Sequence, residues 1–287
     1  MTTNLPENKS PNDRIQNQRN CIYNLQRQGY KVDAEGTCFG IAHMGMQAFL
    51  ADPTMNLFNL RLKCLQKSSQ TFEEKMVGKR FRNEMMPFLD GIALYQKPEA
   101  FSELFAESSQ TLSQDAQRVL PIVMPVKFDK DKTKQPTLII KNYGAYTQSE
   151  LANYLDLLKA HNPDKSFALI LGGNQHCVNL NYRHDKGHWM LVNHDPAASF
   201  TDTTELSNHL VQCFAFSTQE EGVVLATHVY AHQEDKIAIT QAFESLRKNH
   251  DWKQLHTPLN QLTNGLMWIN KERSDTSERS SPTVFRH

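Results

Sequence analysis

Three residues of the chain, Cys38, His176 and Asp195, have the side chains that nucleophilic catalysis by a thiol requires. A thiol is a strong nucleophile when a nearby base takes its proton, and a carboxylate can orient that base. We therefore predict acyl chemistry in which Cys38 attacks a carbonyl carbon, His176 acts as general base and acid, and Asp195 orients the His176 ring. The three residues are far apart in the sequence, so the fold must bring them together.

A β-hairpin is predicted in the stretch that contains both the base and the carboxylate. The first arm, residues 176–182, alternates side chains with the period of a strand, and the second arm, residues 188–194, does the same. The polar connection between them ends in Gly187, a residue type that readily adopts the positive φ of a bulged turn. Pro196 then ends the ladder because proline has no N–H to donate.

The hairpin brings the base and the carboxylate onto facing strands. Folding the arms back places His176 opposite residue 194 or 195, and side chains at such positions have Cβ atoms about 4.5–5.5 Å apart. The turn type fixes the register, and a shift of one residue would place His194 beside His176 in place of Asp195. The pattern therefore predicts a His176–Asp195 pair, with His194 as the alternative.

A buried helix is predicted over residues 38–51, with Cys38 in its first turn. Gly36 and Thr37 are residue types that commonly precede helices, and apolar residues follow at helical spacing. The N-terminal end of a helix favours a thiolate, and its unpaired N–H groups can hold an oxyanion. We therefore expect Cys38 to be an activated nucleophile.

The charge and cysteine content argue against several classes of protein. Lys+Arg and Asp+Glu number 31 each in 287 residues, so the composition gives no electrostatic case for nucleic acid as a partner. The sequence has no run of about 18 apolar residues, so no transmembrane helix is predicted. The polar N-terminus lacks the apolar core of a secretory signal. The odd, scattered set of five cysteines predicts free thiols in a reducing compartment rather than a disulfide scaffold.

Helical periodicity dominates the first half of the chain, and strand-like segments appear in the second half. We therefore predict an α+β fold in one domain, residues 21–250. Its helical lobe, residues 21–119, carries the nucleophile and packs against an antiparallel β-sheet lobe, residues 120–250, which carries the histidine and the aspartate. A flexible N-terminal arm over residues 1–20 and a partly disordered C-terminal extension over residues 251–287 flank this domain.

The remaining elements are predicted from local periodicity and from helix-end signals. Helices are expected over residues 21–28, 55–66, 72–89, 99–105, 111–119, 147–161, 204–214 and 236–248, and strands over residues 120–128, 137–141, 166–171 and 222–230. The helix over residues 147–161 is amphipathic and begins with cap-type residues, so either Thr147 or Ser149 is the expected cap.

Three motif stretches together resemble a known protein family. They are G-T-C-F-G at residues 36–40, H-C-V-N-L-N-Y at residues 176–182, and L-V-N-H-D-P at residues 191–196. With these motifs in this order, the chain resembles papain-like cysteine peptidases, and most closely the YopT-like effector peptidases that bacteria deliver into host cells. The resemblance extends from Tyr30 to Tyr230, and its specific motifs lie in these stretches alone.

The resemblance implies a papain-like fold and a cysteine protease that hydrolyses a peptide or isopeptide bond in a host protein through Cys38, His176 and Asp195. It implies no cofactor and no metal ion. It also implies delivery into the host cytosol by a dedicated secretion system, which needs no cleavable signal. The expected partners are then a host protein substrate and a secretion chaperone, whereas nucleic acid and obligatory membrane insertion are not expected.

Two positions depart from the family pattern. Papain has a glutamine six residues before its cysteine that helps to hold the oxyanion, and Val32 stands at that position here. The donor must then come from another residue, and Gln28 and Asn24 are the alternatives. After Asp195-Pro196 the chain reads A-A-S-F, whereas the family usually has a polar residue and a glycine.

Three other functions are weighed against this hypothesis. A transglutaminase, deamidase or acyltransferase would use the same triad with a different acceptor. A catalytically inactive papain-like fold would act as a host-protein binding module. A metal site would use the nearby residues His184, His188, His194, Asp195 and Cys177. No Cys-x-x-Cys or His-Glu-x-x-His pattern supports zinc, so the metal site is the weakest of the three.

Overall fold

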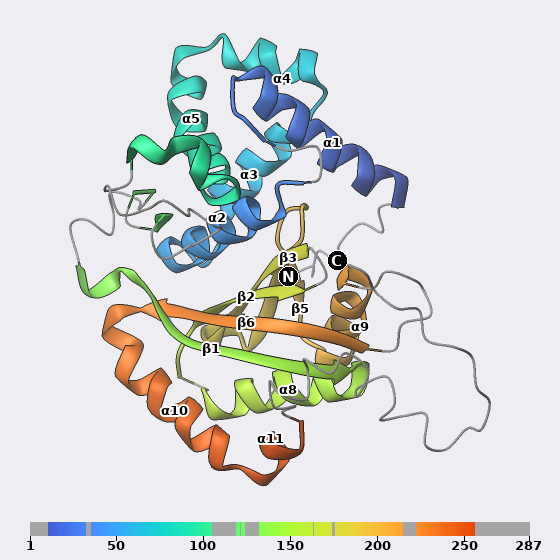
Figure 1. The fold of residues 1–287 in the computed structure, drawn as a ribbon, viewed down its shortest axis with the longest axis vertical. Coiled ribbons are helices and arrows are strands. Elements are labelled where there is room, and N and C mark those ends of the chain that lie inside the picture. Colours follow the sequence, from blue (N-terminus) through green and yellow to red (C-terminus); the bar gives the residue numbers. More distant parts are fainter. Residues whose placement is uncertain are drawn as a thin grey trace.

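The computed structural model describes residues 11–32, 36–104, 119–120, 122–123, 132–162, 164–173, 176–214 and 222–255. These residues form three layers, which are a helical lobe, a six-stranded antiparallel sheet, and further helices on the opposite face of the sheet (Figure 1). The helices of the first layer precede the strands in the sequence, which confirms the predicted α+β class.

The helical lobe contains α1 (Pro11–Arg27), α2 (Cys38–Ala51), α3 (Asn56–Leu65), α4 (Ser69–Met76), α5 (Lys79–Gln96) and the 3-10 helix η1 (Pro98–Leu104). Because α1 begins at Pro11, the arm predicted over residues 1–20 is helical in its second half, and residues 1–10 lie outside the described part. The helix predicted over residues 72–89 is divided in two, because the backbone is extended at Gly78, the N-cap of α5.

The sheet has the strand order β1-β6-β2-β3-β4-β5. Its strands are β1 (Pro136–Thr147), β2 (Phe167–Gly173), β3 (His176–Arg183), β4 (His188–Val192), β5 (Ala198–Phe200) and β6 (Gly222–His232). The short 3-10 turns η2 (Lys132–Lys134), η3 (His184–Lys186) and η4 (Gln233–Asp235) lie beside them. The hairpin of β3 and β4 is the predicted one, and η3 with Gly187 at φ 62° forms its connection.

Helices α8 (Gln148–His161), α9 (Thr203–Phe214), α10 (Lys236–Lys248) and α11 (His250–Leu255) pack on the face of the sheet away from the helical lobe. Of the two expected caps, Thr147 is the one that α8 uses, in a capping box in which Thr147 and Glu150 each accept a hydrogen bond from the other's backbone N–H. The predicted helix over residues 111–119 and strand over residues 120–128 lie mostly outside the described residues. No described helix combines the length and the apolar content needed to cross a bilayer.

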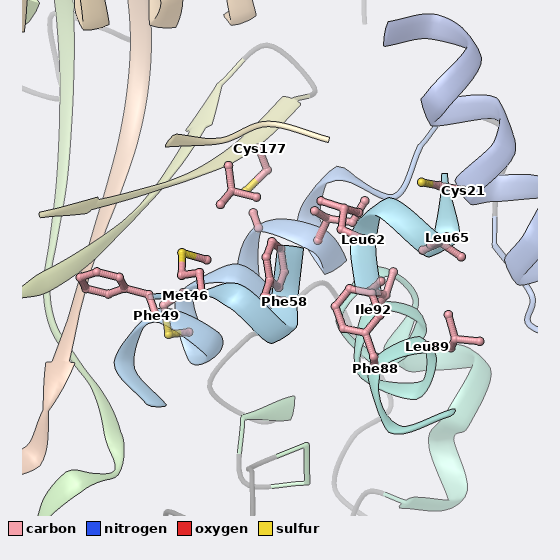
Figure 2. Close-up of a cluster of buried hydrophobic side chains, with 14 of the residues drawn as sticks. Cys21, Met46, Phe49, Phe58, Leu62, Leu65, Phe88, Leu89, Ile92 and Cys177 are labelled. Atoms are coloured by element: carbon pink, nitrogen blue, oxygen red, sulfur yellow. The ribbon is translucent and has the colours of Figure 1, made fainter. Parts of the chain in front are cut away.

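The alternating side chains of the sheet divide the interior into two cores. On one face Ile170 and Cys177 pack with apolar side chains of the helical lobe, and Figure 2 shows Cys177 on the side of the sheet where Met46 and Phe58 lie. On the other face Leu171 and its neighbours pack with α8, α9, α10 and α11. α2 therefore lies against β3, and this contact fixes the position of its first turn.

Gly40 lies where α2 crosses α5. A Cβ atom at this position would lie 2.2 Å from the backbone oxygen of Ile92, so the two helices would have to separate. We expect Gly40→Ala to lower the free energy of unfolding by about 1–3 kcal/mol, although alanine is otherwise the better helix former. Urea unfolding measures this loss.

Gly91→Ala on α5 is the matched control for this prediction. The nearest atom to its new Cβ would be Met44 Sδ at 2.3 Å, and the flexible methionine side chain can move away at small cost. Equal losses of stability in the two variants would contradict the backbone contact as the cause.

Candidate active site

Cys38 is the first residue of α2, and its side chain is partly buried against the sheet. Backbone N–H groups of Cys177, Phe39 and Cys38 itself point at its sulfur. The first of these groups belongs to β3 and directly follows His176. The structure therefore brings the predicted nucleophile to the start of the strand that carries the predicted base.

The electrostatic surroundings of Cys38 differ from the prediction. Burial raises the pKa of the thiol, and the three backbone N–H groups lower it by less, so the pKa lies above its ordinary value. Cys38 is therefore a thiol rather than a thiolate at neutral pH in this structure. Burial outweighs the effect of the helix N-terminus, which the sequence alone had favoured.

His176 begins β3, and its ring is held on three sides. Its Nε2 atom lies 2.7 Å from Asn193 Oδ1. The His194 ring stacks on it with the ring centroids 5.2 Å apart, and the Phe214 ring contacts it with the centroids 5.6 Å apart. Because an amide oxygen only accepts hydrogen bonds, Nε2 carries the hydrogen, and Nδ1 of the neutral ring is the free acceptor.

The protonation state of His176 suits a general base. Burial lowers the pKa of the ring, and the hydrogen bond with Asn193 opposes that effect only in part. The ring is therefore neutral at pH 7 and can take a proton. Among the described residues, however, no hydrogen bond joins the Cys38 thiol directly to the His176 ring.

Asn193, which the sequence did not single out, is the side chain that bonds the His176 ring in the structure. The β3–β4 register pairs Asn179 with Val192, and its continuation would place residue 195 opposite His176, as predicted. The ladder stops at Val192, however, and His194 has a left-handed backbone with φ 55°. Because of this turn, the diagonal neighbour Asn193 is the residue whose side chain reaches the His176 ring.

The Asp195 carboxylate contacts the helical lobe instead. Its Oδ1 atom accepts hydrogen bonds from Asn17 Nδ2 at 3.2 Å and from Gln66 Nε2 at 3.3 Å. Gln66 also donates to the backbone oxygen of His194. Asp195 therefore links the turn after β4 to α1 and to the end of α3.

The two side chains expected to supply the oxyanion donor are not found at the nucleophile. Asn24 is fully buried and donates from its amide to the backbone oxygens of Leu65 and Lys67. Gln28 directly follows α1, and in the described part of the chain no hydrogen bond joins its amide to Cys38.

Gln18 is an amide near the nucleophile that the sequence did not reveal. Gly36 has φ 149°, and a Cβ atom built on it would lie 3.5 Å from Gln18 Nε2 and 3.9 Å from the backbone nitrogen of Cys38. Gln18 therefore reaches the segment that leads into α2. The signal that could have found it is the helical spacing of Cys21, Ile22 and Leu25. These residues lie in α1, and the helix continues upstream from them through Gln18.

The residues of the alternative metal site are spread over different surroundings. His184 lies in the turn η3, whereas the His194 ring stacks on His176. Cys177 points into the core on the α2 face. The described residues contain no group of three or more His, Cys, Asp or Glu side chains arranged to hold a metal ion.

Comparisons of the chain with known protein families, with curated proteins and with solved structures gave no match. The likeness to papain-like and YopT-like peptidases therefore rests on the three motif stretches in the sequence. The function has to be argued from the site itself.

Proposed function

We propose that the protein is a papain-like cysteine hydrolase in which Cys38 is the nucleophile, His176 is the general base and acid, and Asn193 orients the His176 ring. The observation that carries this proposal is the 2.7 Å contact between His176 Nε2 and Asn193 Oδ1. Because Nε2 carries the hydrogen, Nδ1 of His176 is the acceptor. The next residue, Cys177, supplies the backbone N–H group that bonds the Cys38 sulfur.

The chemistry follows from these roles. Nδ1 of His176 accepts the thiol proton as the Cys38 sulfur attacks the carbonyl carbon of the substrate, and the oxyanion is held by backbone N–H groups at the start of α2 and by the Gln18 amide. His176 then gives its proton to the leaving amine, and the C–N bond breaks to leave a thioester. Water attacks the thioester with His176 again as base, which releases the acid and restores the thiol.

The starting state is a neutral pair. The raised pKa of the Cys38 thiol and the lowered pKa of the His176 ring favour thiol and imidazole over thiolate and imidazolium. Proton transfer must therefore accompany the attack on the substrate, and it requires that the His176 ring reach the Cys38 thiol. This is general-base catalysis rather than attack by a preformed thiolate.

The substrate class comes from the resemblance. A YopT-like peptidase acts on a host protein after delivery by a secretion system, so the proposed substrate is a peptide or isopeptide bond in a host protein. The same three groups also serve transglutaminases, deamidases and acyltransferases, which differ only in the group that accepts the acyl unit.

One observation favours a second candidate, a binding module without activity. The Cys38 thiol is neutral and lacks a direct hydrogen bond to His176 among the described residues. A papain-like fold that has lost its activity and only binds a host protein would show the same resting geometry.

The experiment that separates these functions is an analysis of products. The protein and its Cys38→Ala variant are incubated with a host-cell lysate, and mass spectrometry searches for new N-termini, deamidated glutamines and new isopeptide cross-links. New N-termini that depend on Cys38 support the peptidase, and either of the other products supports the alternative acceptor. If neither protein changes the lysate, the binding module is the better account.

Substitutions of Asn193 and Asp195 should differ in their effect on activity. We expect Asn193→Ala to lower kcat by about 100-fold, because an error of about 1 Å in the position of a catalytic group costs that much. Asp195→Asn keeps an oxygen acceptor for Asn17 and Gln66 and should leave kcat near the wild-type value. Steady-state kinetics on the substrate found in the lysate measure kcat of both variants. A larger loss of kcat in Asp195→Asn than in Asn193→Ala would show that Asp195 orients the ring.

A further inference from the structure

The end of α9 contacts both members of the His176–Asn193 pair. Asn193 Nδ2 donates a hydrogen bond to Cys213 Sγ over 2.9 Å. The next residue, Phe214, contacts the His176 ring with the ring centroids 5.6 Å apart. Two consecutive residues of one helix therefore touch the base and the group that orients it.

The orientation of the Asn193 amide decides which nitrogen of His176 is free. With Oδ1 toward the ring, Nε2 carries the hydrogen and Nδ1 is the acceptor. With the amide reversed, Nδ2 would donate to Nε2, and the hydrogen of the neutral ring would move to Nδ1. His176 could not then take the Cys38 proton through Nδ1.

Cys213 supplies the contact that separates these two orientations. In the observed orientation its sulfur accepts a hydrogen bond from Nδ2, whereas with the amide reversed the weak S–H donor would have to serve Oδ1 instead. α9 is itself held in place, because Leu206, Leu210 and Phe214 are buried in the core between the helix and the sheet. The acceptor is therefore presented by a fixed element rather than by a loop.

We propose that Cys213 is a positioning residue, which fixes the amide of Asn193 and through it the tautomer of His176. Its significance for catalysis rests on the proposed function, whereas its effect on the His176 ring does not depend on any substrate. Cys213 acts through Asn193 and needs no contact with the substrate.

The ring itself reports on this inference. ¹⁵N NMR of the imidazole nitrogens gives the fraction of each neutral tautomer, and the His176 signals are assigned by their loss in His176→Gln. We expect the Nε2–H form to dominate in the wild-type protein and the Nδ1–H fraction to rise in Cys213→Ala.

Cys64, which lies on α3 in the helical lobe, provides the matched control. Cys64 Sγ also accepts a side-chain hydrogen bond, from Lys75 Nζ at 3.7 Å, so Cys64→Ala removes a similar contact elsewhere. That variant should leave the His176 tautomers unchanged. Unaltered tautomers in Cys213→Ala, or equal changes in Cys213→Ala and Cys64→Ala, would overturn the inference.

Kinetics distinguish failure of this inference from failure of the proposed function. If the protein is a hydrolase, Cys213→Ala should lower kcat by about tenfold at unchanged KM, because a positioning group acts on the transition state rather than on substrate binding. A tautomer change in Cys213→Ala with no hydrolysis by the wild-type protein would support the inference and overturn the proposed function. Hydrolysis by the wild-type protein with no tautomer change in Cys213→Ala would support the proposed function and overturn the inference.

Discussion

Cys38→Ala should lower hydrolysis by at least about 10³-fold, because removal of the nucleophile of a catalytic triad leaves only the contributions of binding and the oxyanion site. His176→Ala should cause a loss of the same order. The double variant should lose no more than either single variant, since the two groups act as one unit. Cleavage of the lysate substrate, followed by mass spectrometry, measures all three.

Stability should change little in Cys38→Ala, because the side chain is only partly buried at the first turn of α2. Cys64→Ala is the control for removal of a thiol distant from the site, and we expect it to retain hydrolysis. If Cys38→Ala keeps the full effect of the protein on host cells, Cys38 is not a nucleophile and the binding module is correct.

Acid should destabilise the fold through His43. This side chain on α2 is fully buried and stacks on Tyr95, and among the described residues its Nε2 atom has no hydrogen-bond partner. Burial, with the charge of nearby His228 and against the hydrogen bond to the Phe39 backbone oxygen, lowers the pKa of the ring to about 3. The folded state therefore keeps His43 neutral, whereas the unfolded chain protonates it below its ordinary pKa of about 6.5.

The sign of the effect follows from this difference. Above pH 6.5 both states are neutral, and the stability does not depend on His43. Between pH 6.5 and 3 the unfolded state binds more protons, so the free energy of unfolding falls as the pH falls. At pH 5 the loss from His43 is about 2 kcal/mol. His194 acts in the same direction, because burial, with the charge of His176, lowers the pKa of its ring to about 3.

Urea unfolding at pH 7 and pH 5 measures this loss. His43→Gln removes the titrating group and should make the stability less dependent on pH over this range, even if it lowers the stability at pH 7. Equal slopes in the wild-type protein and in His43→Gln would show that His43 is accessible to protons in the folded state.

The local elements of this fold could be predicted because their patterns are local. The alternation along β3 and β4 and the helical spacing in α2 can be recognised from neighbouring residues alone, and the start of α8 needs only a cap-type residue such as Thr147. The register of the hairpin was also predicted, since continuing the ladder beyond Val192 places residue 195 opposite His176.

The side chain that bonds the His176 ring could not be predicted from that register. The ladder ends one residue before Asn193, and the left-handed backbone of His194 redirects the chain. No pattern of residue types marks a histidine for positive φ. The same face of the hairpin carries Asn193 and His176, so Asn193 was available as the diagonal neighbour.

The first half of α1 was missed for a different reason, whereas its second half lies in the helix predicted over residues 21–28. Its contacts with the rest of the lobe include asparagine amides that bind backbone oxygens, Asn20 to Gln66 and Asn24 to Leu65 and Lys67. Such a polar helix face looks like a solvated arm in the sequence. Gln18 was missed with it, because its approach to Gly36 is a tertiary contact.

The central claim is that His176 acts on Cys38, and the most direct test is the rate of alkylation of Cys38 by iodoacetamide as a function of pH. In the wild-type protein we predict two rises, one as the His176 ring loses its proton below about pH 6.5 and one above the ordinary thiol pKa of about 8.5. His176→Ala should keep only the second rise, and Cys38→Ala identifies the signal. The same profile with and without the His176 ring would contradict the account.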